Sequence, residues 1–249
     1  MTAPTAAVTT RGLTKRYGSH TALHGIDLDI RRGSVFGMIG PNGAGKTTTM
    51  RLLLDIIRPS GGELRVLGES PRAGGAGLRR RVGYLPGELH LQARVRAREL
   101  LSHYAEISGD VRPGTVESLA DRLGLDLGRP VRNLSKGNKQ KVGLIQAFMH
   151  EPELLVLDEP TSGLDPLSCR LVDDLIVETR DRFGVTSVVI SHDMAGALRI
   201  ADHIYLLSKG KIEASGTPAE LVEGTNQLAQ EFFESSGIDA HRLIRQGSA

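Results

Sequence analysis

The amino-acid sequence predicts an α/β fold with a mostly parallel core sheet, an N-terminal antiparallel β subdomain and an inserted helical subdomain. Short, continuously apolar runs recur after residue 150, as in parallel strands that are buried on both faces. Residues 7–39 alternate apolar and polar positions, the period of antiparallel strands, whereas the period is helical over 92–150. We therefore expect a single domain, residues 1–249. In it a core lobe (7–91 and 151–223) is interrupted by a helical lobe (92–150) and followed by a tail (224–249).

Each predicted element follows from a local pattern. Leucines at helical spacing predict a helix over 47–57, which the Pro and Gly residues at 58–62 end. Residues 70–77 are small and rich in Pro and Gly, so we expect a flexible connection there. A helix pattern separates the apolar runs 154–157 and 185–190, and another lies near 228–233 in the tail. The predicted strands are an antiparallel set from residue 7 onward, then 35–39, 63–67, 82–85, 154–157, 185–190, 204–207 and 211–214.

Composition excludes several classes of protein. A hydrophobic content of 39% and a charged content of 24% fit a soluble globular protein. The net charge of +2 is too small to argue for nucleic acid as a partner. No apolar run approaches the roughly 20 residues that cross a bilayer, so we expect no direct membrane span, and residues 1–10 predict no signal peptide. The single Cys169 permits no internal disulfide and fits a packed helix residue in a reducing compartment.

A phosphate-binding loop follows the predicted strand at 35–39. Residues 40–47, Gly-Pro-Asn-Gly-Ala-Gly-Lys-Thr, fit the pattern G-x-x-x-x-G-K-[ST] of P-loop NTPases. Glycines let the backbone wrap phosphate closely, and the N-terminus of the next helix attracts the same anion. Lys46 is expected to reach the β- and γ-phosphates and Thr47 to bind Mg²⁺. The nucleotide-binding candidates in this segment are Gly40, Asn42, Gly43, Gly45, Lys46, Thr47 and Thr48.

Two adjacent carboxylates end the apolar run at 154–157. Because the carboxyl ends of parallel strands share one edge of a sheet, Asp158 and Glu159 are expected beside the phosphate loop. Asp158 is predicted to hold Mg²⁺, and Glu159 to take the proton of an attacking water. Together the two segments predict an ATPase, with ATP and Mg²⁺ as its ligands.

Further motifs make the chain resemble ABC-type ATPases. Residues 133–141, Asn-Leu-Ser-Lys-Gly-Asn-Lys-Gln-Lys, resemble the signature segment written L-S-G-G-Q, and residues 162–165, Ser-Gly-Leu-Asp, resemble the D-loop. Ser191-His192-Asp193 resembles the switch histidine, and Tyr17 matches the aromatic residue that stacks on adenine. The six motifs keep the order of the family, and the resemblance continues to about residue 223.

The resemblance implies a shared mechanism. Two such domains pair head to tail, here as a homodimer, and ATP lies between the phosphate loop of one and the signature of the other. Ser135 and the N–H of Gly137 would then bind the γ-phosphate from across the interface, with Asp165 of the D-loop nearby. His192 would fix the γ-phosphate and Glu159 would act as base. The implied role is the motor of a transporter, on the cytoplasmic face of the membrane beside an integral membrane permease subunit.

The chain departs from the family pattern at two places. Lys136 replaces the first Gly of the signature and Asn138 replaces its Gln. This variant is similar to that of single-domain subunits of bacterial drug-efflux systems. Gly87 stands where the family has a Gln that binds Mg²⁺. Either Glu88 substitutes as an oxygen ligand or the metal keeps an additional water.

Other classes of protein share parts of this pattern. A soluble ABC-type ATPase in DNA repair would need long coiled coils, and one in translation would carry two such domains in one chain. An iron–sulfur assembly ATPase stays open as the alternative. A switch GTPase or small-molecule kinase is disfavoured by the signature and by Ser191-His192.

Overall fold

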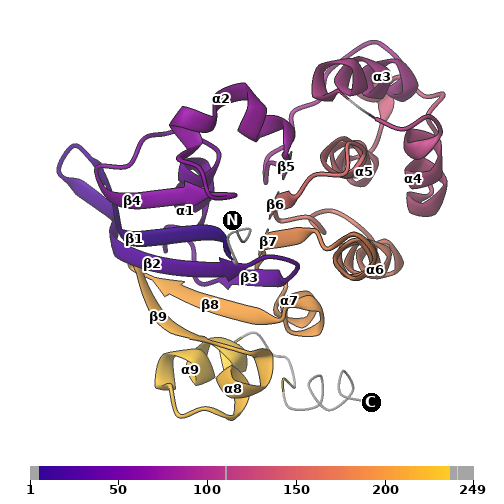
Figure 1. Ribbon diagram of the computed structural model, residues 1–249. Coiled ribbons are helices and arrows are strands. Elements are labelled where there is room, and N and C mark those ends of the chain that lie inside the picture. The colour runs from indigo at the N-terminus through magenta and orange to yellow at the C-terminus, as the bar shows by residue number, and fades with distance from the viewer. Residues whose placement is uncertain (1–5, 110, 236–239, 241–249) are drawn as a thin grey trace.

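Two sheets with helices around them make up the fold (Figure 1). The computed structural model describes residues 6–109, 111–235 and 240. The strands are β1 (Ala6–Tyr17), β2 (His20–Arg31), β3 (Val35–Ile39), β4 (Gly61–Val66), β5 (Val82–Leu85), β6 (Leu154–Asp158), β7 (Thr186–Ile190), β8 (His203–Ser208) and β9 (Lys211–Gly216). The helices are α1 (Lys46–Leu53), α2 (Pro71–Arg80), α3 (Ala97–Ser108), α4 (Thr115–Leu123), α5 (Lys136–Phe148), α6 (Pro166–Phe183), α7 (Met194–Ile200), α8 (Pro218–Glu223) and α9 (Gln227–Ser235), with the 3-10 turn η1 (Val131–Asn133) before α5.

The larger sheet brings the ends of its parallel strands to one edge. Its strand order is β5-β6-β7-β3-β8-β9, and every neighbouring pair is parallel except β8 and β9. Asp158, the last residue of β6, is in register with Ile190, the last residue of β7. The loops after β3, β6 and β7 therefore leave the sheet at the same edge, where open α/β sheets place their ligand sites.

Side chains of the parallel strands point alternately to the two faces of this sheet. In β6, Leu154 and Val156 belong to one buried cluster, whereas Leu155 and Leu157 belong to another. All five residues of β3, of β6 and of β7 are buried. Strands covered on both faces need apolar residues throughout, which explains the continuous apolar runs. The predicted fold class is confirmed.

Different layers cover the two faces. The face of Leu154 and Val156 packs against α1 and the antiparallel sheet β2-β1-β4. The face of Leu155 and Leu157 packs against α3, α4, α5 and α6, and Figure 1 shows α3 and α4 on the side away from β4. The division at residues 92 and 150 stays a prediction, because α5 shares a buried cluster with Leu85 of the core sheet.

The C-terminal helices form a third buried cluster, which α7, α8 and α9 share with β8. The expected tail helix near 228–233 is present as α9, and the rest of the predicted tail, 236–239 and 241–249, lies outside the described residues. Helices α7 and α8 were not predicted. Both begin at a capping residue, since Asp193 accepts a hydrogen bond from the Gly196 N–H and Thr217 accepts one from the Glu220 N–H.

Two predicted elements differ in the structure. The helix expected over 47–57 ends at Leu53, because Leu54 leaves helical geometry and Asp55 has a φ of +55°. Residues 70–77 were wrongly expected to be a flexible connection, and they form most of α2. Pro71 occupies the first turn, where proline is tolerated, and Leu78 is buried in the core. Only Gly75 departs from the helix, with φ 53° and ψ −134°.

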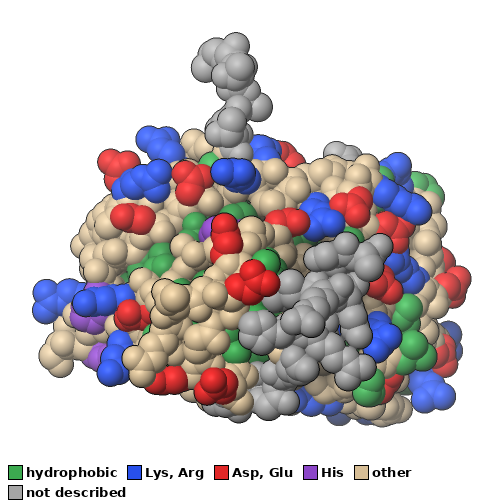
Figure 2. All heavy atoms as spheres, turned by 90° about the horizontal axis from the view of Figure 1, so that it is seen from below, with side chains coloured by type: hydrophobic (Ala, Val, Ile, Leu, Met, Phe, Trp, Pro, Cys, Tyr) green, Lys and Arg blue, Asp and Glu red, His purple; other side chains and the backbone are tan. Residues whose placement is uncertain are grey.

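The surface carries both signs of charge. On the described part of the face in Figure 2, Lys and Arg side chains lie interspersed with Asp and Glu. One residue with two ion pairs is Arg81, which binds both Glu153 (2.5 Å) and Glu69 (2.8 Å). Arg81, which directly follows α2, thus links the turn after β4 to the residue before β6.

Candidate functional site

The phosphate loop connects β3 to α1 at the carboxyl edge of the large sheet. Two of its glycines, Gly40 and Gly45, lie too close to their neighbours for a side chain. A Cβ atom at Gly40 (φ +144°) would lie 2.0 Å from the carbonyl oxygen of Leu207, and one at Gly45 (φ +107°) would lie 2.7 Å from the side chain of Leu23. These contacts hold the loop against β8 and β2.

Lys46 starts α1 and folds back over the loop. Its Nζ donates hydrogen bonds to the carbonyl oxygens of Gly40 (2.6 Å) and Pro41 (3.0 Å). Burial lowers the pKa of Lys46 from its ordinary value, and the charges of Glu159 and Asp158 act against that shift. A cation and the first N–H groups of a helix therefore face the same space, which favours an anion there.

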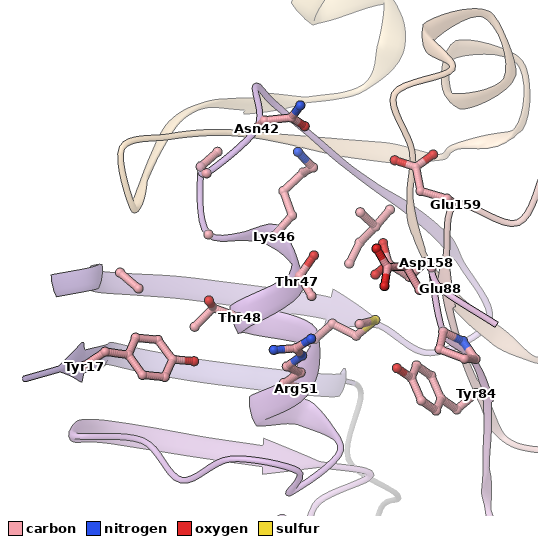
Figure 3. Close-up of a pocket in the computed structure, with 18 of the residues that line it drawn as sticks. Tyr17, Asn42, Lys46, Thr47, Thr48, Arg51, Tyr84, Glu88, Asp158 and Glu159 are labelled. Atoms are coloured by element: carbon pink, nitrogen blue, oxygen red, sulfur yellow. The ribbon is translucent and has the colours of Figure 1, made fainter. Parts of the chain in front are cut away.

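A cavity of about 720 Å³ joins most of the predicted nucleotide-binding residues. Figure 3 shows Lys46 and Thr47 of α1 pointing toward the space that Asp158 and Glu159 approach from the opposite side. The predicted residues that line it are Tyr17, Asn42, Gly43, Gly45, Lys46, Thr47, Thr48, Asp158 and Glu159. Lining residues that were not predicted include His20, Arg51, Tyr84 and His90.

Asp158 is 6% exposed and lies against the loop that follows β5. Burial and the neighbouring Glu159 raise the pKa of Asp158 to about 6, while Lys46, a hydrogen bond from the Gly87 N–H and Arg51 act in the opposite direction. A Cβ atom at Gly87 would lie only 2.9 Å from Oδ2 of Asp158. The glycine that replaces the family's Gln is therefore in close contact with the predicted metal ligand. Glu88 lines the same cavity.

Glu159 and His192 come together from neighbouring strands. Nδ1 of His192 lies 2.7 Å from Oε2 of Glu159, and the His192 N–H donates to the same oxygen at 3.2 Å. The Ser191 hydroxyl is 3.4 Å from it. The His192 side chain is 79% exposed, so it is open to an approaching ligand or chain. The predicted base and the predicted switch histidine therefore form one unit.

The signature residues lie at the start of α5. Ser135 is the N-cap of α5, and its Oγ accepts a hydrogen bond from the Asn138 N–H at 3.2 Å. Gly137 packs on the D-loop, because a Cβ atom there would lie 2.7 Å from the carbonyl oxygen of Gly163. Among the described residues, neither Ser135 nor Gly137 lines the 720 Å³ cavity. The chain's own phosphate loop and signature thus occupy separate places.

Two other predicted residues have local partners. Asp165 caps α6, since its carboxylate accepts hydrogen bonds from the Ser168 N–H (3.0 Å) and the Ser168 hydroxyl (2.6 Å). These hydrogen bonds lower the pKa of the Asp165 carboxyl. Tyr17, at the end of β1, is 44% exposed, and Nζ of Lys15 lies 4.9 Å from its ring centroid. A ring face in this position is available for stacking.

Gln140 is a buried polar residue of this region that the sequence interpretation missed. Its amide donates to the carbonyl oxygens of Glu159 (2.9 Å) and Pro160 (3.3 Å). A signal was available, because Gln140 lies one turn after Gly137 on a helix with many buried positions.

Comparison with known proteins agrees with this geometry. A family model described as ABC transporter matches residues 23–162. A bacitracin transport ATP-binding protein of Bacillus licheniformis is 33% identical over 241 residues, which cover 96% of this chain and 78% of that protein. A fluoroquinolones export ATP-binding protein of Mycobacterium tuberculosis is 36% identical, over 87% of this chain and 73% of that protein. A solved ATP-binding subunit of an ABC transporter matches with a TM-score of 0.81 and 26% identity, over 98% of this chain and 100% of that chain.

Proposed function

The chain belongs to the ABC transporter family of ATP-binding proteins, and we propose that it drives an exporter whose membrane-crossing part is a separate chain. It binds and hydrolyses ATP, as members of this family do. The observation that carries the proposal is that one cavity is lined by Lys46 and Thr47 together with Asp158 and Glu159. Phosphate-binding and proton-accepting groups thereby face one another across a space large enough for a nucleotide.

The phosphate loop binds the β- and γ-phosphates. Backbone N–H groups of the loop and of the first turn of α1 donate to their oxygens. When ATP binds, the ammonium group of Lys46 leaves the carbonyl oxygens of Gly40 and Pro41 and donates hydrogen bonds to phosphate oxygens instead. Thr48 adds a hydroxyl in the same turn, and Tyr17 stacks on adenine at the other side of the cavity.

Thr47 and Asp158 fit a Mg²⁺ ion. Their hydroxyl and carboxylate oxygens are the ligands that Mg²⁺ prefers, and a cation would offset the burial that raises the pKa of Asp158. When bound, Mg²⁺ would neutralise charge that builds up on the phosphate oxygens. Gly87 supplies no side-chain ligand, so either Glu88 or an additional water would complete the coordination shell of the Mg²⁺ ion.

Glu159 acts as the base of hydrolysis. It accepts a proton from water as the water oxygen bonds to the γ-phosphorus and the bond from that phosphorus to the β–γ bridging oxygen breaks, which leaves ADP and phosphate. His192 holds Oε2 of Glu159 and so orients the carboxylate. The exposed ring of His192 would also contact the γ-phosphate.

A second copy of the chain completes the site. Ser135 and Gly137 lie outside the cavity that holds Lys46, so they serve the nucleotide of a partner. The N-terminus of α5 carries a partial positive charge that suits a γ-phosphate. In a head-to-tail homodimer each ATP is held between the phosphate loop of one copy and the signature of the other, near Asp165.

The membrane-crossing part is an integral permease subunit. No helix within residues 6–109, 111–235 and 240 is long and apolar enough to cross a membrane. The names of relatives that serve bacitracin transport and fluoroquinolones export support coupling to a permease and an outward direction. The dimer then sits on the cytoplasmic face of the membrane. These names do not favour the alternative of an iron–sulfur assembly ATPase.

Co-purification and an ATPase assay test this function. We expect the chain to co-purify with a membrane protein that has about six apolar spans of roughly 20 residues. Phosphate release by the complex should stop in a Lys46→Ala variant that still folds, because a charge that neutralises phosphate is lost. Co-purification with a soluble partner alone would contradict the transporter role, and near-normal turnover of folded Lys46→Ala would contradict the site.

A further inference from the structure

The buried amide of Gln140 joins the signature helix to the base of hydrolysis. Gln140 is 4% exposed, and its Nε2 donates to the carbonyl oxygens of Glu159 and Pro160 at 2.9 and 3.3 Å. Without this amide the Pro160 carbonyl oxygen would lose its donor, which is unfavourable in the protein interior, whereas the Glu159 carbonyl oxygen would keep a hydrogen bond from the Ser162 N–H at 3.1 Å. The two contacts therefore fix the Glu159–Pro160 peptide relative to α5.

Glu159 depends on such support because of its backbone conformation. Its φ is +53°, in the left-handed region that residues with a side chain disfavour. The Glu159 N–H donates to the carbonyl oxygen of Ile190 in β7 at 2.8 Å. With Gln140 on its carbonyl oxygen, Glu159 is held on both sides by two different elements. The direction of its carboxylate is thereby tied to the position of α5.

We propose that Gln140 is a positioning residue for ATP hydrolysis, which keeps the Glu159 carboxylate aimed at the attacking water and links it to the signature at the start of α5. This inference rests on the proposed function. In the head-to-tail dimer, Ser135 and Gly137 bind the partner's ATP, whereas Glu159 acts on the chain's own ATP. A movement of α5 that follows nucleotide binding at one site therefore reaches the base of the other site through Gln140.

The D-loop provides a second contact along the same route. Gly137 packs against the carbonyl oxygen of Gly163, three residues beyond Pro160 in sequence. The segment that begins with Glu159 thus touches α5 at Gln140 and again at Gly137. Because this segment contacts α5 at both residues, we expect the segment and the helix to move together, without a hinge between the signature and Glu159.

A Gln140→Met variant tests the role of the amide, because methionine has similar length and helix propensity but no hydrogen-bond donor. We expect kcat for ATP to fall by about tenfold to a hundredfold, as for a misplaced catalytic group, with KM for ATP changed less than about threefold. ATP-bound dimer should accumulate in gel filtration, since binding persists while chemistry slows. The matched control is Gln146→Met on the same helix, with a side chain that is partly exposed, and it should keep the parental kcat.

A purely structural role predicts a different result. It would lower the melting temperature of Gln140→Met and leave the kcat of the folded fraction at the parental value, or weaken ATP binding and dimerisation together; each outcome would overturn the proposal. If Gln140→Met does not fold, Gln140→Asn withdraws the amide by one methylene and is measured instead. Failure of both to fold would also show that the residue is structural. A parental protein that does not hydrolyse ATP, or a Glu159→Gln protein that forms no ATP-bound dimer, would count against the proposed function rather than against Gln140.

Discussion

Nδ1 of His192 lies 2.7 Å from Oε2 of Glu159, and the N–H of the same histidine donates to that oxygen at 3.2 Å. The two residues follow β7 and β6, which are neighbouring parallel strands in register at Ile190 and Asp158. The sheet therefore brings together a carboxylate and an imidazole that are 33 residues apart in the chain. Three polar groups of a single loop contact this one carboxylate oxygen when the Ser191 hydroxyl is included.

Replacing Glu159 with Gln should stop chemistry and spare binding. The amide keeps the shape of the side chain but accepts a proton poorly, so phosphate release should fall by about 10²–10⁴-fold. ATP should still bind and should hold the dimer closed, which gel filtration detects. The exposed Glu213→Gln on β9 is the control and should behave as the parental protein. Parental turnover in Glu159→Gln would remove Glu159 from the role of base.

The role of Glu88 can be read from a Mg²⁺ titration. If Glu88 replaces the missing Gln as an oxygen ligand, Glu88→Ala should raise the Mg²⁺ concentration needed for half-maximal ATPase activity. The cavity places Glu88 in the required neighbourhood. An unchanged titration would favour an additional water in the metal shell.

The contact between Gly87 and Asp158 predicts that a side chain is harmful at position 87. The added Cβ of Gly87→Ala would lie 2.9 Å from Oδ2 of Asp158 and should displace it. We expect a loss of about 1–3 kcal/mol in the free energy of unfolding, together with reduced Mg²⁺-dependent activity. Gly77→Ala is the control, because a Cβ there would meet no described atom within 4 Å. Full activity and stability of Gly87→Ala would show that the loop adapts freely.

The raised pKa of Asp158 predicts a pH dependence of stability in the nucleotide-free protein. The pKa is about 6 in the folded protein and 3.8 as a reference. Between pH values of about 4 and 6 the folded state binds more protons than the unfolded state. The stabilisation of the folded state by protonated Asp158 is therefore fully present below about pH 4 and is lost as pH rises through about 6. Asp158→Asn removes this titration. Its melting temperature should exceed that of the parental protein more at pH 8 than at pH 5, and an equal difference at both pH values would contradict the shift.

Much of the fold and the cavity could be predicted from sequence because local patterns determine them. The strands β3 and β5 were predicted with the bounds that the structure shows, since their apolar runs are short and sharply ended. The phosphate loop and the Asp158-Glu159 pair were predicted from motifs whose geometry follows from a strand followed by a turn. Their presence in one cavity agrees with this prediction.

Other features depend on contacts between distant segments. Helix α2 was missed because its glycines and proline resemble a loop, whereas burial of Leu78 favours the helix. The need for glycine at position 87 follows from its contact with Asp158, which the sequence does not show. The role of Gln140 follows from the positive φ of Glu159, which the sequence does not show either. The roles of Asp165 and His192 toward nucleotide stay predictions, since both side chains here contact residues of the same chain.

Mixing two inactive variants tests the shared site most directly. Lys46→Ala and Ser135→Ala homodimers should each be inactive, because each substitution damages both composite sites. In a mixed dimer one site carries both lesions, and the other joins an intact phosphate loop to an intact signature. Verified mixed dimers, measured with the membrane partner if activity requires it, should therefore recover part of the parental ATPase activity. Absence of recovery, or strong activity of the Ser135→Ala homodimer by itself, would contradict the sharing of each ATP between Lys46 of one copy and Ser135 of the other.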